Sequence, residues 1–108
     1  MTYKVVVTGA AKQDLRSAYL WAAERAPDTA ALWLQRFEAE LQTLTHFPDR
    51  FQLAPENALV ESEIRQLIFG RRKSAYRALY TIVGDQVQIL HIRRAARNWA
   101  KSEDLIVE

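Results

Sequence analysis

The sequence predicts an α+β domain in the order β-αα-βββ, in which an N-terminal strand and an antiparallel helical hairpin pack on a mostly antiparallel sheet. Three observations predict it. Apolar residues between 10 and 47 recur at helical spacing, and after residue 63 they alternate with a period of two. The chain has 108 residues and is 49% hydrophobic, which suits one domain, 1–108, with a single packed core.

The N-terminal half is expected to form one strand and two helices. Tyr3–Val7 is a β-rich run, and Thr8 is a suitable N-cap for a helix that starts near Ala10. Pro27 ends this helix, and the second helix stops at Pro48, because the residue before a proline avoids helical backbone. The two helices are separated by almost no linker, so they should form an antiparallel hairpin.

The C-terminal half is expected to contribute three strands after an irregular connection over residues 48–62. We expect these strands at Ile64–Phe69, Ala75–Val83 and Gln86–Arg93. Gly84-Asp85 is a good signal for a two-residue hairpin turn, which sets Val83 opposite Gln86. The residues after the last strand could form a short C-terminal helix through Asn98-Trp99.

The predicted turn also fixes which side chains share a face of this hairpin. If the register continues along the strands, Arg77 lies opposite Ile92, and Arg94 is its diagonal neighbour, roughly 7–8 Å away. Leu79 lies on the same face. Two arginines on rigid strands at that separation could clamp one phosphate or carboxylate. The alternative is that Arg77, a charge in mid-strand, bridges to a nearby carboxylate.

Basic residues are crowded into residues 63–97. This stretch contains eight of them against Glu63 and Asp85, a net charge of +6, whereas the whole chain carries +2. They are Arg65, Arg71, Arg72, Lys73, Arg77, Arg93, Arg94 and Arg97. Concentrated guanidinium groups predict an anionic partner. The Arg71-Arg72-Lys73 hairpin tip is either a solvated loop or part of that contact.

Composition excludes several classes of function. The chain has no cysteine, so disulfides and thiolate chemistry are excluded and a reducing cytoplasm is the expected location. Two histidines without metal-ligand spacing predict no metal site, and we expect no cofactor and no small-molecule substrate. No signal peptide and no apolar run long enough for a bilayer is present, so no membrane partner is expected.

Three further side chains are candidates for function. His91 could act as a general acid or base, since histidine exchanges protons near neutral pH. The predicted register puts it on the face opposite Arg77, so a half-buried histidine at the sheet edge is the alternative. Trp21 lies on the polar side of the first helix, either as an interface anchor or packed against residues 48–62. Trp99 either folds back over the core or is held by a partner.

Several short motifs, in their order and spacing, resemble the RelE/ParE superfamily of toxins from type II toxin–antitoxin modules. The resemblance extends over about ninety residues and rests on Thr8, Ala11, Asp14-Leu15, Leu41, Leu44, Phe47-Pro48, Arg65-Gln66-Leu67, Tyr76–Tyr80 and Val87–Ile92 with the arginines that follow. It implies a growth-inhibiting protein of the plasmid-stabilisation type, which a cognate antitoxin binds and silences.

The resemblance leaves the activity open between two classes. ParE-like toxins inhibit DNA gyrase, whereas RelE-like toxins cut messenger RNA on the ribosome without a metal. In a nuclease, Arg65, Arg77 and Arg94 would neutralise the phosphoryl charge. His91 or Lys73 would then transfer the proton. No complete acid–base set converges on Arg77 in the predicted register, so gyrase is the expected target; a third alternative is a chain that has lost toxicity and only binds an antitoxin.

Two sets of residues are expected to make the macromolecular contacts. Those for the target are Arg71, Arg72, Lys73, Arg77, Arg93, Arg94 and Arg97. Those for the antitoxin are Trp21, Arg77, Leu79, Arg94 and Trp99. The antitoxin would lie across the sheet and the helical hairpin as an extended or helical segment.

Overall fold

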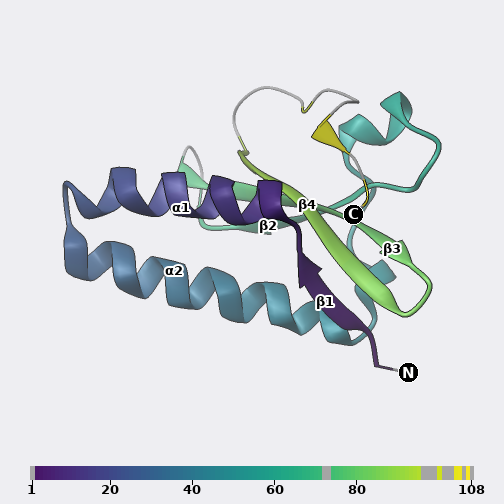
Figure 1. The fold of residues 1–108 in the computed structure, drawn as a ribbon, viewed down its shortest axis with the longest axis horizontal. Coiled ribbons are helices and arrows are strands. Elements are labelled where there is room, and N and C mark those ends of the chain that lie inside the picture. The colour runs from purple at the N-terminus through teal and green to yellow at the C-terminus, as the bar shows by residue number, and fades with distance from the viewer. Residues whose placement is uncertain (1, 72–73, 96–99, 101–103, 106, 108) are drawn as a thin grey trace.

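The computed structural model describes residues 2–71, 74–95, 100, 104–105 and 107. In these residues four strands form one sheet, and two helices pack on one of its faces (Figure 1). The elements are β1 (Lys4–Val7), α1 (Gly9–Ala23), α2 (Pro27–Gln42), β2 (Arg65–Phe69), β3 (Tyr76–Val83) and β4 (Gln86–Arg94), with short 3-10 turns η1 (Thr43–Thr45), η2 (Pro48–Arg50) and η3 (Pro55–Leu59). The predicted α+β order is confirmed, and the C-terminal helix falls outside the described residues.

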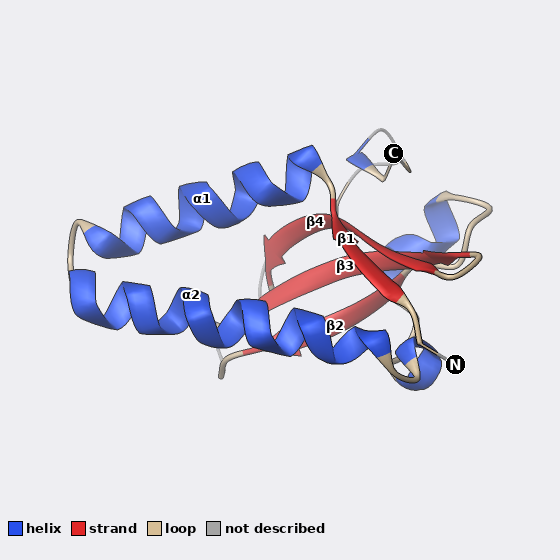
Figure 2. Ribbon diagram, turned by 60° about the horizontal axis from the view of Figure 1, so that its bottom comes forward, coloured by secondary structure: helices blue, strands red, loops and turns tan. Residues whose placement is uncertain are grey.

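The strand order places the first strand beside the last. The sheet runs β1-β4-β3-β2, with β1 parallel to β4 and the other pairs antiparallel. β4 is therefore a central strand. Figure 2 shows α1 and α2 side by side against the sheet, with the turn that joins them projecting beyond it. Neither of the two described α-helices is long and apolar enough to span a membrane.

Thr8 caps the first helix, as predicted, and also joins it to the sheet. Its Oγ1 accepts a hydrogen bond from the Ala11 N–H at 3.3 Å, which caps α1. The same hydroxyl donates to the Ile89 carbonyl at 2.8 Å. Thr8 is only 2% exposed, and its hydrogen bond to β4 fixes the start of α1 relative to the sheet.

The helix-side core lies between the helical hairpin and the sheet. The apolar stripe of α2 supplies Phe37 and Leu41, both buried, as its helical spacing predicted. The Phe37 ring stacks on Phe69 of β2 with centroids 4.8 Å apart. Tyr80 of β3 is fully buried in the same core, and its hydroxyl donates to the Pro48 carbonyl at 2.5 Å.

The opposite face of the sheet is also covered. A far-side cluster joins Leu79 and Leu90 to Ala54 and Ile64 of the connection before β2, and to Ala100 and Leu105 near the C-terminus. Leu79 is fully buried there. Leu79 was expected to contact the antitoxin, but its side chain is not exposed, because this face of the sheet is packed against the protein's own chain.

The register of the last hairpin begins as predicted and then changes. Val83 pairs with Gln86 across the turn. A β-bulge interrupts the ladder between Leu79 and Tyr80, where Leu90 is the extra residue on β4. Every β4 residue beyond this point is shifted by one position relative to β3.

The bulge separates the two arginines that were expected to act together. Beyond it, Arg77 pairs with Arg93, and Tyr76 pairs with Arg94. The predicted pairing of Arg77 with Ile92 is therefore wrong. Because successive side chains along a strand point to opposite faces, Arg77 and Arg94 project from opposite sides of the sheet.

Candidate functional site

Arg77 is held inside the protein by a carboxylate. Its Nη1 donates to Glu56 Oε1 at 2.8 Å, and its Nη2 donates to Glu56 Oε2 at 2.6 Å. The Nη1 group also donates to Gln66 Oε1 at 3.1 Å. Arg77 is 5% exposed and Glu56 is fully buried, so the alternative of an internal bridge is the one observed. The predicted Arg77–Arg94 clamp does not form.

Glu56 joins three parts of the chain at this point. It lies in η3, it binds Arg77 of β3, and its Oε2 accepts a hydrogen bond from the Ala100 N–H at 2.8 Å. Burial by itself raises the pKa of the Glu56 carboxyl, but the hydrogen bonds from Arg77 and Ala100 outweigh it and leave the pKa below its ordinary value of 4.5. The carboxylate is therefore charged, and it binds Arg77 and the backbone of Ala100, which belongs to the far-side cluster.

The other described arginines that were predicted at a contact differ in their surroundings. Arg65 donates to the Phe51 carbonyl at 2.7 Å and to Glu63 at 3.0 Å. Arg93 donates to Asp104 at 3.0 Å. Arg71 and Arg94 are exposed. Of the remaining residues expected at a contact, Arg72, Lys73, Arg97 and Trp99 lie outside the described residues.

His91 lies in the central strand and is bound to the first helix. Its Nδ1 is 2.6 Å from Asp14 Oδ2, which also accepts the Ile92 N–H at 2.9 Å. Its Nε2 is 4.0 Å from Asp104. The expected half-buried state is confirmed, with 12% of the side chain exposed, and β1 pairs with β4 only as far as Ile89, so His91 lies beyond the end of β1. The expected face is wrong, because beyond the bulge His91 pairs with Leu79, which shares the face of Arg77.

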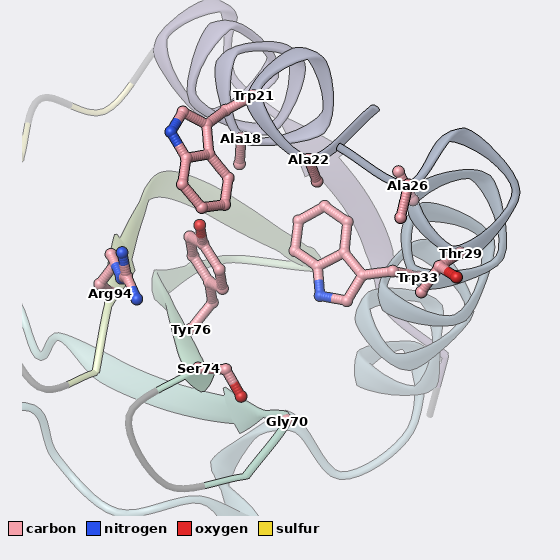
Figure 3. Close-up of a pocket in the computed structure, with 11 residues that line it drawn as sticks. Ala18, Trp21, Ala22, Ala26, Thr29, Trp33, Gly70, Ser74, Tyr76 and Arg94 are labelled. Carbon is pink, nitrogen blue, oxygen red and sulfur yellow. The ribbon is translucent and has the colours of Figure 1, made fainter. Parts of the chain in front are cut away.

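A pocket opens between the helical hairpin and the ends of β3 and β4 (Figure 3). We call it the Trp21 pocket; its volume is about 240 Å³. The rings of Trp21, Trp33 and Tyr76 form its walls, with Arg94 at one side. Its remaining lining includes Ala18, Ala22, Ala26 and Ala30 from the two helices and the turn between them, whose small side chains leave the space open.

Trp21 is available at this pocket. Its side chain is 55% exposed, and the Arg25 guanidinium lies 3.8 Å above the centre of its ring. It lies beside Arg94 and Tyr76, and the 48–62 connection does not line the pocket. The structure therefore brings together Trp21 and Arg94, two of the residues predicted at the antitoxin interface. The alanines spaced four apart are the sequence signal that could have located the pocket.

Comparisons with known proteins agree with this fold. The family model described as ParE toxin of type II toxin-antitoxin system, parDE, matches residues 5–99. Toxin RelE1 of Caulobacter vibrioides is 32% identical over 92 residues, which are 85% of this chain and 92% of that protein. A solved structure, the chromosomal ParDE TA system from P. aeruginosa, matches with a TM-score of 0.71 at 22% identity, over 86% of this chain and 96% of that chain.

Proposed function

We propose that this chain, which belongs to the ParE toxin family of type II toxin–antitoxin systems within the RelE/ParE superfamily, arrests growth by inhibiting DNA gyrase. Its family makes a cognate antitoxin its partner. The choice of gyrase over messenger RNA rests on the chemistry that the described side chains can perform.

The buried Arg77–Glu56 pair is the observation that carries this proposal. A metal-free ribonuclease needs fixed cations against the phosphoryl oxygens of its substrate. The terminal nitrogens of Arg77 instead donate to Glu56, at 2.8 and 2.6 Å. Separating a buried pair of this kind leaves an uncompensated charge and costs about 3–5 kcal/mol, which opposes a role in binding phosphate.

The candidate acid–base group does not complete a nuclease site either. The bulge brings His91 to the same face of the sheet as Arg77, but His91 is engaged by Asp14 of α1 and Arg77 is engaged by Glu56. Arg65, the third candidate, donates to Phe51 and Glu63. Arg65, Arg77 and His91 are thus each engaged by different groups of the protein, which favours inhibition of gyrase by binding.

The experiment compares the two activities on purified protein. One assay follows supercoiling and cleavage-complex formation by DNA gyrase, and the other follows messenger RNA on programmed ribosomes. We expect inhibition of gyrase and intact RNA. Cuts in ribosome-bound RNA without any effect on gyrase would overturn the proposal in favour of the nuclease, and inertness in both assays with harmless expression would indicate a chain that only binds its antitoxin.

A paired substitution tests Arg77 without leaving a buried charge. In Glu56→Leu with Arg77→Met, both charges are removed together, which is often neutral for stability. We expect this double variant to keep its fold by circular dichroism and to keep gyrase inhibition. Loss of both RNA cleavage and toxicity in a folded double variant would assign Arg77 to a nuclease instead.

For the antitoxin, we propose the Trp21 pocket as one point of contact. Its aromatic walls suit a bulky apolar side chain, and Arg94 at its side suits a carboxylate that follows such a residue. Trp21 is exposed in the free chain and ready to be covered. Arg77 and Leu79, the other described residues expected here, are buried and would support the sheet from within.

A further inference from the structure

Phe47 presents an aromatic ring to solvent from a strained backbone. Its φ of 47° and ψ of 56° lie in the left-handed region, and it is the one non-glycine residue with a positive φ in the described part of the chain. L side chains are disfavoured there, and the following Pro48 favours an extended backbone at this position. The ring is 77% exposed, so packing does not compensate for the strain.

The loop around Phe47 is held on two sides. The Arg50 Nη1 donates to the carbonyls of His46 at 2.5 Å and Phe47 at 3.1 Å, and the Arg50 backbone N–H donates to the Phe47 carbonyl at 3.1 Å. From the core, the buried Tyr80 hydroxyl donates to the Pro48 carbonyl at 2.5 Å. These bonds fix the backbone on both sides of the ring, so the ring projects from a rigid base.

A rigid exposed phenyl group is a suitable anchor for a partner. Strained backbone persists where the surrounding structure enforces it, and such residues concentrate at binding sites. An aromatic anchor on a fixed backbone loses little conformational freedom on binding, and aromatic anchors dominate the energetics of many protein interfaces. Phe47 is 77% exposed and contributes little to the core, which favours a role in recognition.

The Phe47 site is separate from the Trp21 pocket. Phe47 follows the C-terminal end of α2, whereas the pocket includes residues near the N-terminal end of the same helix. The helix has 16 residues, which corresponds to a length of about 24 Å at the standard rise. A partner seated in the Trp21 pocket therefore leaves Phe47 exposed unless it extends along the whole helix.

The charges next to Phe47 favour a protein over a nucleic acid. Asp49 is an exposed carboxylate two residues away, and it would repel a phosphate backbone. The guanidinium of Arg50 donates to backbone carbonyls of its own loop. An apolar wedge between bases works together with cations on the flanking phosphates, whereas the Arg50 guanidinium is already occupied by carbonyls of its own loop.

We infer that Phe47 is the anchor that this toxin inserts into an apolar pocket on its target protein, separate from the surface that the antitoxin covers. This inference rests on the proposed function, in which the target is DNA gyrase. The two contact sites thus lie at opposite ends of α2: the antitoxin binds at the Trp21 pocket, and the target protein binds at Phe47.

The substitution Phe47→Asn tests the anchor, because asparagine tolerates left-handed backbone and removes the ring. We expect a melting temperature no lower than that of the wild type, unchanged affinity for the antitoxin, and inhibition of gyrase weakened by about tenfold or more. Phe47→Tyr keeps the ring and should keep the inhibition. Leu32→Gln, which removes another exposed apolar side chain from α2, is the matched control and should inhibit as the wild type does.

Three results would overturn the inference: a Phe47→Asn protein that melts several degrees lower, one that inhibits gyrase as well as the wild type, or one that loses the antitoxin instead. Failure of the proposed function is visible separately, because the wild type would then leave gyrase untouched. In that case growth arrest in cells is the measurement. A stable Phe47→Asn protein that no longer arrests growth supports the anchor on a different target protein, and one that still arrests growth overturns it.

Discussion

Glu56 and Arg77 close a doubly hydrogen-bonded ion pair inside the protein, with N–O distances of 2.6 and 2.8 Å. The pair fastens the η3 turn to β3 beneath the face of the sheet that the helices leave free. The same carboxylate holds the backbone at Ala100, so this face of the sheet is closed by the protein's own chain. Arg77, which the sequence predicted as a contact to phosphate, therefore has a structural role here.

Glu56→Gln should destabilise the protein by about 3–5 kcal/mol, because it leaves the Arg77 charge buried without a counter-charge. Urea unfolding measures this loss. Glu63→Gln is the matched control, since it breaks an arginine pair whose carboxylate side chain is 69% exposed. The control should change stability by less than about 1 kcal/mol. Equal effects of the two substitutions would contradict the importance of the buried pair.

Stability should fall in acid through the same carboxyl. The pKa of Glu56 is below 4.5 in the folded protein, so the folded state releases this proton more readily than the unfolded chain does. Its contribution is therefore complete above pH 4.5 and is lost as the pH falls below that value through the folded pKa. Unfolding measured between pH 6 and pH 3 should show this slope, and Glu56→Gln should flatten it.

Tyr80 should make the protein sensitive to alkali. Burial raises the pKa of its hydroxyl to about 12, compared with 10.0 for an ordinary tyrosine. The folded state holds this proton more tightly, so its contribution is present below pH 10 and is lost as the pH rises from 10 towards 12. Absorbance at 295 nm should show one of the four tyrosines ionising late, and Tyr80→Phe should remove that late step.

The same substitution has a measurable effect at neutral pH. Tyr80→Phe leaves the Pro48 carbonyl without the hydroxyl that donates to it, which should cost about 1–3 kcal/mol. Tyr19→Phe is the control on α1. A Tyr80→Phe protein as stable as the wild type would show that water replaces the hydroxyl at Pro48.

The Trp21 pocket predicts how the antitoxin binds. Trp21→Ala should weaken antitoxin affinity by roughly 30-fold, the effect of losing a central aromatic contact. The melting temperature should change little because the side chain is 55% exposed. Titration calorimetry with the cognate antitoxin is the measurement.

Two variants sharpen this test. Leu20→Gln replaces the neighbouring side chain, which is 48% exposed and is absent from the pocket lining, and should bind the antitoxin as the wild type does. Arg94→Gln should weaken binding and reduce its dependence on salt, because a charge pair with the antitoxin is removed. Normal affinity in both Trp21→Ala and Arg94→Gln would remove the pocket from the interface.

The local features of the fold could be predicted because their signals lie within a few residues. Thr8 caps the first helix as expected, and Pro27, which was expected to end that helix, marks the break as the first residue of the second; each acts on its own neighbours in the chain. Gly84 has a φ of 61°, a conformation that glycine adopts freely, and its turn sets Val83 opposite Gln86 as expected.

The errors arise where distant residues decide the structure. The bulge at Leu90 carries no glycine to mark it, yet it reverses the faces of every later β4 residue relative to β3. Glu56 follows a proline in a segment without periodicity, and nothing nearby in the sequence indicates that it binds a side chain 21 positions later. Those two features decide whether Arg77 can reach a partner, so the fold was predictable and the arginine site was not.

The side-by-side placement of β1 and β4 has a consequence for how the toxin is made. Lys4–Val7 is synthesised well before its neighbour in the sheet, Gln86–Arg94. The four-stranded sheet therefore cannot close until β4 has left the ribosome. A message that terminates before β4 yields a chain in which β1 has no partner strand.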